Sequence, residues 1–260
     1  MQNSKLIKIS NLGLNEINID KANDSIYLID CDINITVKEG IFVNIIDNSK
    51  NSNISIVGLR DSNIKYTILN SSSSKRVFNI SGELNINEIN LEATNEELTV
   101  NLLNENASCN IRCLSIATNM NNIFKQLISH KAVSTFSNIT NVGVAMDKSN
   151  ITFDTSGKIE KGMNKSKCAQ LSKGIVMDDT SIIEAKPILL IDEFDCFANH
   201  GASIGKMSDD DLFYLMSRGL TKSEAFLLIL QGIIKPFIDN IDVEEYKSNI
   251  ESEIKNLIEK

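Results

Sequence analysis

Apolar and polar residues alternate along most of this chain, from about residue 5 to about residue 193. The alternation is plainest at residues 16–19, 33–37 and 53–57, which are rich in Ile and Val. Side chains two positions apart share one face of a strand, and β-branched residues suit a half-buried sheet. Strands of the same kind are expected at residues 83–91, 97–103, 110–117, 131–136 and 143–145.

Asparagine is the residue that we expect to make the turns between these strands. The chain has only 12 Gly and 2 Pro, whereas 27 of its 32 Asn lie in the first 150 positions. Asn tolerates left-handed backbone angles, which suit the corners of a coil of parallel strands. Few Asn-Gly pairs signal tight hairpins, so the pattern favours a mainly β solenoid. A β-sandwich stays open as the alternative, because no strict repeat is visible.

Near residue 206 the pattern changes to that of helices. Ser208 and the following three Asp residues read as an N-cap with an acidic first turn, and residues 221–224 form a capping box. Pro236 should kink or end the second helix, and Asp242 can cap a third. The sequence therefore predicts a β domain at residues 1–206 and a small helical domain at residues 207–260.

Charge and composition exclude several classes of protein. The net charge is −8, which argues against a nucleic-acid or anionic-membrane surface. No run approaches the roughly 18 apolar residues of a membrane span, and the first ten residues lack the apolar stretch of a signal peptide. Five Cys, an odd number, fit reduced thiols. We expect a cytoplasmic protein.

Few residues suggest chemistry, because no phosphate loop, nucleophile elbow or paired CxxC motif is present. Cys109 and Cys113 lie four apart and are expected to be small core residues. Cys196 and His200, also four apart, offer a thiolate and an imidazole, and both bind iron. The alternative is that Cys196 packs and His200 bonds the backbone. The carboxylates between residues 192 and 195 are expected to form a solvated edge.

Three segments in order, at residues 186–192, 199–206 and 211–220, resemble the SufB/SufD family, the scaffold subunits of SUF iron–sulfur cluster assembly. They include Asn199-His200-Gly201-Ala202-Ser203 and the run Leu212-Phe213-Tyr214-Leu215-Met216-Ser217-Arg218-Gly219. Shorter similarities occur at residues 129–131, 148, 157–159 and 173–179.

The resemblance implies a right-handed parallel β-helix followed by a C-terminal helical domain, and a scaffold that is not an enzyme. Such scaffolds pair through their β-helices with a SufB-type subunit or a second copy. Their helical domains bind a SufC-type ABC ATPase, so that ATP acts only through this partner. The resemblance also implies a transient iron–sulfur cluster at the dimer interface. It assigns the ATPase contact to Leu212, Phe213, Tyr214, Arg218 and Gly219.

Within the family the resemblance favours a SufD-like chain. His200 matches the SufD-type histidine of cluster assembly, and is therefore the expected metal ligand, with Cys196 beside it. Ser181 stands where SufB-type chains have their essential Cys, and Gly201 where they have an acidic residue. His130 is expected to be structural. Two alternatives remain: a short SufB-like scaffold acting as a homodimer, and a carbohydrate-active β-helix.

Overall fold

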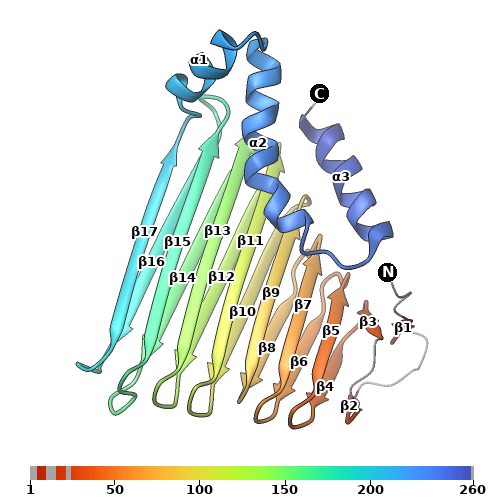
Figure 1. The fold of residues 1–260 in the computed structure, drawn as a ribbon, viewed down its shortest axis with the longest axis vertical. Helices are drawn as coiled ribbons and strands as arrows, with labels where there is room; N and C mark the ends of the chain where they lie inside the picture. The colour runs from red at the N-terminus through yellow and green to blue at the C-terminus, as the bar shows by residue number, and fades with distance from the viewer. Residues whose placement is uncertain (1–4, 10–15, 22–24, 259–260) are drawn as a thin grey trace.

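The chain coils into two facing sheets of parallel strands in a computed structural model, which describes residues 5–9, 16–21 and 25–258 (Figure 1). The nine-stranded sheet contains β1 (Leu6–Lys8), β3 (Ile26–Ile29), β5 (Phe42–Asp47), β7 (Asn63–Leu69), β9 (Glu83–Asn90), β11 (Ser108–Thr118), β13 (Phe136–Met146), β15 (Lys167–Val176) and β17 (Phe197–Gly205). The eight-stranded sheet contains β2 (Glu16–Ile19), β4 (Ile33–Val37), β6 (Asn53–Gly58), β8 (Lys75–Ile80), β10 (Thr94–Leu102), β12 (Asn121–His130), β14 (Asn150–Ile159) and β16 (Ile182–Ile191).

Consecutive strands alternate between the two sheets, so each rung of the coil contributes one strand to each sheet. Every inner strand pairs in parallel with the strand two before it and the strand two after it, and the four end strands have one such neighbour. This is the connectivity of a parallel β-solenoid, and it confirms the mainly β fold expected from the sequence. A β-sandwich would need antiparallel neighbours, and none occurs in the described part of the chain.

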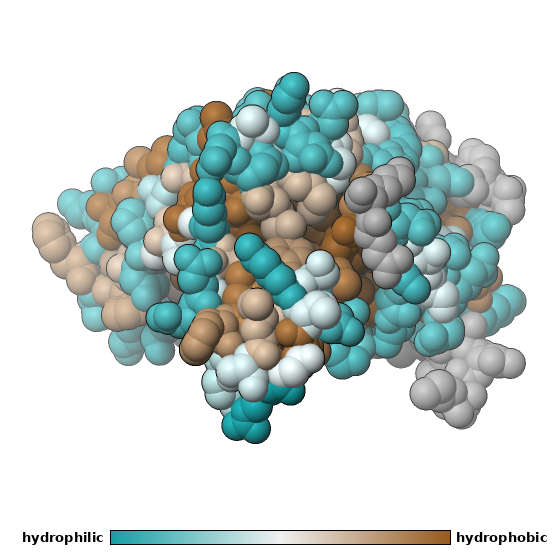
Figure 2. All heavy atoms as spheres, turned by 90° about the horizontal axis from the view of Figure 1, so that it is seen from above, coloured by the Kyte–Doolittle hydropathy of each residue, from teal (hydrophilic) through white to brown (hydrophobic). Residues whose placement is uncertain are grey.

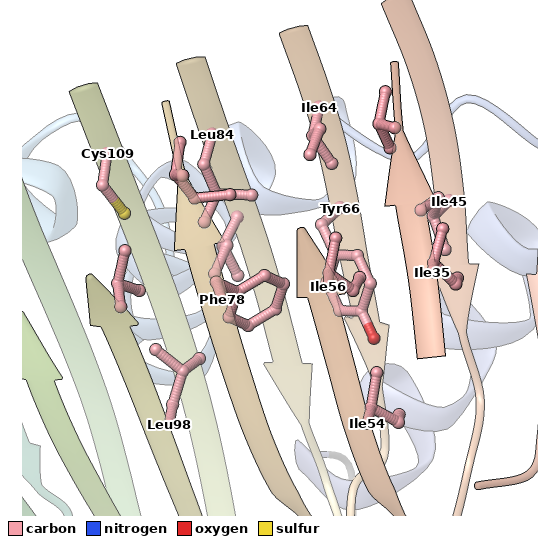
Figure 3. Close-up of a cluster of buried hydrophobic side chains, with 14 of the residues drawn as sticks. Ile35, Ile45, Ile54, Ile56, Ile64, Tyr66, Phe78, Leu84, Leu98 and Cys109 are labelled. Carbon is pink, nitrogen blue, oxygen red and sulfur yellow. The ribbon is translucent and has the colours of Figure 1, made fainter. Parts of the chain in front are cut away.

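The interior of the coil is built from columns of side chains in register. Ile45, Tyr66, Ile86 and Ile111 occupy one such column on successive strands, and all are buried. Figure 3 shows Ile45, Tyr66 and Phe78 lying between the sheets, and the rings of Tyr66 and Phe78 meet edge to face at 5.1 Å. Full burial of each such side chain contributes roughly 1.5–3 kcal/mol, so the columns stabilise the stack.

Left-handed residues make the corners, as the sequence suggested. Asn51, Asn70, Asn106 and Asn119 all have φ between 52° and 64°. Asp61, Ser134, Asp147, Lys148 and Lys165 adopt similar angles, so Asn is common at the corners without being required. The prediction of a strand at residues 131–136 is wrong. This segment is a corner, because the strand before it continues to His130 and the next begins at Phe136.

Three helices follow the last strand: α1 (Asp209–Ser217), α2 (Lys222–Ile238) and α3 (Glu244–Ile258). Ser208 caps α1, and Thr221 with Glu224 closes the capping box of α2. Pro236 lies inside α2, which continues for two more residues. None of the described helices is long and apolar enough to cross a membrane.

The second and third helices fold back over the nine-stranded sheet (Figure 1). Leu230 and Ile234 of α2 join one buried cluster with Leu114 and Val142 of that sheet, and Ile250 of α3 joins the same cluster. Asp242 turns towards the sheet and accepts a hydrogen bond from Asn44 Nδ2 at 2.5 Å. Figure 2 views the molecule from the helical end and shows apolar atoms gathered in its middle between polar rims.

A charged cluster lies inside the coil, where sequence alternation alone would place apolar residues. The Arg76 side chain has no exposed surface. Its Nε donates to Asp47 Oδ2 at 2.7 Å, and its Nη1 donates to Glu96 Oε2 at 3.0 Å. Tyr66 also donates to Asp47, at 2.7 Å. Hydrogen bonds of this kind are needed to offset the desolvation of buried charges.

Glu88 adds a third buried carboxyl to this cluster, opposite a single guanidinium. Neither oxygen of Glu88, nor Oε1 of Glu96, accepts a hydrogen bond from an N–H or O–H group of the described residues, and only the weakly donating Cys113 thiol lies beside Glu88. Burial, followed by the neighbouring Glu96, raises the pKa of Glu88 well above its usual value. A proton held between the two carboxyl groups supplies the missing donor and removes one buried negative charge.

Replacing Glu88 by Gln should flatten the pH dependence of stability. The folded wild-type chain keeps a proton that the unfolded chain releases above pH about 4.3. The free energy of unfolding of wild type, relative to Glu88→Gln, should therefore fall by about 1.4 kcal/mol per pH unit above pH about 5. Urea unfolding followed by circular dichroism from pH 5 to 8 measures this. Glu105→Gln, at an exposed corner, is the control, and parallel curves for wild type and Glu88→Gln would contradict the shared proton.

Candidate functional site

The candidate site is the end of the solenoid formed by β16 and β17. Each rung is covered by the next one, but no strand of the described chain stacks on this last rung. Two strands of ten and nine residues therefore present a free edge. Long open edges are templates for pairing with another chain, and proteins usually cover them.

The free edge of β17 offers an uninterrupted row of backbone donors and acceptors. The Phe197 N–H donates to the Ser166 carbonyl at 3.0 Å, so the odd-numbered residues of β17 direct their backbone groups to β15. Alternation in a parallel sheet then turns the N–H and C=O groups of the even-numbered residues to the free edge. These residues are Ala198, His200, Ala202 and Ile204.

The edge of β16 is interrupted. Ile182 N–H donates to Ser149 O and Asp192 N–H to Ile159 O, so the even-numbered residues face β14. The backbone nitrogen of Pro187 consequently faces the free edge, where proline offers no donor. Of the two terminal strands, β17 is therefore the better template for a partner strand.

His200 lies near the middle of β17, and its side chain points to the inner side of the coil. Its register partner Gln170 is buried, whereas the neighbouring pair Leu171 and Gly201 belongs to the outer face. The imidazole is nonetheless exposed, because no further rung closes the interior above it. The alternative that His200 bonds the backbone is not supported, because His200 makes no such hydrogen bond among the described residues.

Cys196 lies at the corner before β17 and is half-buried. Its Sγ donates to the Glu193 carbonyl at 3.1 Å, and burial, then Glu193 and Asp195, raises the pKa of its thiol. The chain from Cys196 to His200 is nearly extended, so four positions separate them by about 13 Å. This exceeds the span of one ion with bonds of about 2.0–2.3 Å. The described residues contain no group of three metal-binding side chains.

The acidic corner is a solvated turn, as expected. Asp192 and Asp195 are exposed. Glu193 accepts hydrogen bonds from the backbone N–H groups of Gly162, Phe194 and Asp195, which lower the pKa of its carboxyl. These bonds fix the corner from which β17 starts and leave Phe194 fully exposed.

Residues expected to be structural are buried. His130 has no exposed surface, and its two ring nitrogens contact Thr135 Oγ1 and Ser137 Oγ, each at 2.8 Å. Burial lowers the pKa of His130 to about 4, so the ring is neutral near pH 7. Cys109 and Cys113 are also buried, as predicted. Ser181 is buried at a corner and hydrogen-bonds Asp178 at 2.9 Å, away from the free edge.

The residues of α1 that were expected to contact an ATPase differ in their exposure. Phe213 and Tyr214 are 75% and 57% exposed, whereas Leu212 is only 8% exposed. Arg218 stacks over the Tyr214 ring at 5.3 Å, and Gly219 ends the helix with φ of 101°. Leu212 therefore anchors α1, and any part it has in docking would be indirect.

Sequence reasoning did not single out the apolar residues that surround the free edge. Ile188 and Leu190 on the outer face of β16, with Phe197 and Ile204 of β17, are all exposed. A signal was present, because residues 188–191 are apolar on both faces of the strand. Both faces of a strand are apolar only where both are covered. The end of the coil thus exposes apolar side chains that a partner could cover.

Comparison with known proteins gives one family. Residues 29–233 match the family model described as SUF system FeS cluster assembly, SufBD core domain. The chain is similar to the iron–sulfur cluster assembly protein SufD of Bacillus subtilis, with 37% identity over 116 residues, 45% of this chain and 26% of that protein. It is also similar to a SufBD family protein of Pyrococcus horikoshii, with 36% identity over 118 residues, 45% of this chain and 24% of that protein. The matched stretch thus spans about a quarter of each relative.

The five thiols should react in two classes. Cys31 and Cys196 are partly exposed, whereas Cys109, Cys113 and Cys168 are buried, and burial raises the pKa of all five. Because access then decides the rate, a disulfide reagent at pH 8 should label Cys31 and Cys196 in the native protein. The other three should react only in denaturant. Peptide mapping identifies the labelled cysteines. Cys196→Ser should lose one of the two rapidly reacting thiols. Labelling of Cys113 in the native protein at the rate of Cys196 would contradict the burial of Cys113.

Proposed function

Since this chain belongs to the SufBD family of the SUF iron–sulfur cluster assembly system, we propose that it is a SufD-like, non-enzymatic scaffold subunit. The observation that carries the proposal is the free edge of β17 with His200 near its centre. A scaffold needs one surface for a second scaffold chain and another for the motor protein. The end of the solenoid and the exposed face of α1 supply two such surfaces on one chain.

The partner scaffold pairs with the free edge of β17. The backbone groups of Ala198, His200, Ala202 and Ile204 continue the sheet by strand addition, and main-chain hydrogen bonds supply affinity in this mode. The exposed Phe197 and Ile204 then become buried in the interface. The partner strand also closes the coil over His200, which places the imidazole at the seam between the two chains.

The cluster is the cargo of the scaffold, and His200 is its protein ligand on this chain. Imidazole is a good iron ligand. Cys196 lies too far along the strand to share one iron ion with His200. The remaining ligands of a shared, transient cluster therefore come from the partner chain.

The exposed residues Phe213 and Tyr214 of α1 bind a SufC-type ABC ATPase, and Arg218 stiffens this surface by stacking on Tyr214. Aromatic and Arg side chains are the usual energetic centres of such interfaces. ATP acts only in the partner. This helix follows β17 after three residues, so the proposed ATPase site is close in the sequence to the strand that pairs with the partner scaffold.

The SufB-like homodimer keeps one observation in its favour. His200 lies one residue from Gly201, the middle of the nine-residue β17. Antiparallel pairing of β17 with its own copy around a two-fold axis at Gly201 would bring both imidazoles to the axis. The SufD-like assignment stays the first choice because Ser181 occupies the position of the SufB-type Cys.

Phe213→Ala should weaken binding of the SufC-type ATPase from the same organism by roughly tenfold or more, because an exposed aromatic anchor is lost. Tyr214→Ala should act in the same direction. Isothermal titration with the purified ATPase measures both affinities. Leu228→Ala is the matched control, since Leu228 is an exposed apolar residue of α2. The affinity of this variant for the ATPase should equal that of wild type. Equal affinity of Phe213→Ala and wild type would remove α1 as the docking surface.

Two neighbouring substitutions should separate pairing from cluster chemistry. Ala202→Pro removes an N–H group from the free edge without breaking a bond to β15, so it should abolish pairing with the partner scaffold. His200→Ala keeps every backbone group, so it should pair normally and lower the yield of cluster in the assembled complex. Size-exclusion chromatography with light scattering measures pairing, and iron and sulfide analysis measures the cluster.

Pairing that survives Ala202→Pro would refute strand addition at β17 and leave the docking helix untouched. Unchanged cluster yield in His200→Ala would leave a purely structural scaffold. Circular dichroism of both variants confirms that the solenoid has folded.

A further inference from the structure

A cleft of about 570 Å³ opens between α2 and the outer face of the nine-stranded sheet, above β11, β13, β15 and β17. It lies at the junction of the helices with the coil, and its lining includes Ile204 of β17 but not His200. Clefts of roughly 300–1,000 Å³ at such junctions are typical of small-molecule sites. The cleft is also separate from the outward-facing side chains of α1, Phe213 and Tyr214, which are not among its lining residues.

The walls of the cleft are largely apolar. Val142 and Leu171 contribute from the sheet, and Ile229 and Ile233 contribute from α2. Leu171 is one of the exposed apolar residues of the molecule, although it lies under a helix. These walls suit a flat apolar body rather than a hydrated ion.

Two cations reach the same cleft without an anionic partner. The Arg112 guanidinium lies over the Phe237 ring, 5.0 Å from its centre, which fixes its plane and leaves its N–H groups free. Lys173 lies two strands away on β15, and Thr140 and Ser203 place hydroxyl groups beside them. Neither Arg112 nor Lys173 makes an ion pair or a side-chain hydrogen bond within the described chain. Lys206, also in the lining, is already paired with Asp179 at 2.6 Å.

The helix that roofs the cleft carries glycine at its open side. Gly232 lies within α2, where Gly costs about 1 kcal/mol relative to Ala. A Cβ placed there would meet no atom within 4 Å. Pro236, four residues on, cannot donate to the Gly232 carbonyl, so this acceptor lacks its usual partner. Position 232 therefore accepts a Cβ, and a larger side chain there is expected to enter the cleft that Gly232 lines.

We propose that this cleft binds a small organic anion, with its charged group held by Arg112 and Lys173 and its apolar body between α2 and the sheet. The planar fork of Arg112 fits two oxygens of a phosphate or carboxylate group, and Lys173 adds a second positive charge. Asp211, the carboxylate in the lining, lies on α1, so the charged group of the ligand is expected on the side of Arg112 and Lys173.

Titration with 1-naphthyl phosphate tests the proposal on the full chain, because this probe combines the two required parts. It should bind with one-to-one stoichiometry. The affinity should be at least about tenfold higher than for 1-naphthol, which lacks the charge, or for inorganic phosphate, which lacks the apolar body. Arg112→Met and Lys173→Met should each weaken binding about tenfold, whereas Lys161→Met, at a distant corner, should leave it unchanged.

Gly232→Leu keeps both cations and fills the cleft, so it should abolish binding while the melting temperature is unchanged or raised. That variant guards against misfolding as an explanation. No saturable binding to wild type overturns the proposal. Binding that Gly232→Leu, or both methionine variants, leave at the wild-type affinity overturns it as well, because the probe would then sit elsewhere.

Discussion

A parallel solenoid closes each rung only by stacking the next one on it, and this constraint governs the whole molecule. Backbone groups of every inner strand are satisfied by its two neighbours, and the inward columns are sealed in the same way. The last rung has one neighbour only, so it keeps unused donors and acceptors and exposes side chains that elsewhere would be core. His200 is in an interior position by its register with Gln170 and on the surface by its place in the stack. A reactive side chain becomes accessible here without any pocket being built for it.

Period-two alternation predicted the strands because every strand hides one face, and Asn predicted the corners because the coil turns at left-handed residues. Capping residues marked α1 and α2 for the same local reason. The sequence could not indicate the charged cluster around Arg76, since Glu88 and Glu96 belong to a residue type normally found at the surface, although their strand positions turn them inward. It also misplaced residues 131–136, where an apolar stretch serves a corner. The exposure of His200 depends on where stacking ends, and no local pattern encodes that.

The helices are part of the same packing problem. Leu230 and Ile234 of α2 cover apolar residues on the outer face of the sheet, which would otherwise remain open to water. Coverage is incomplete above β15 and β17, where Gly232 and Pro236 of α2 line the cleft together with residues of both strands. This incomplete coverage creates the cleft that holds Arg112 and Lys173. The stability of the sheet and the availability of the cleft thus depend on the same helix, which explains why the opening lies next to a well-packed cluster.

Few residues separate α1 from the strand that carries His200, and that strand is paired on one side only. Only residues 206–208 join the helix to β17, and β17 is held by β15 on one side alone. A force applied at the exposed face of α1 would therefore reach a strand that is hydrogen-bonded to a neighbour on one side alone. Inner strands are bonded on both sides, whereas β17 is bonded on one. That strand carries the imidazole of His200 and the free edge together. Under the proposed function, a displacement of β17 would move the partner-binding edge and the cluster ligand together.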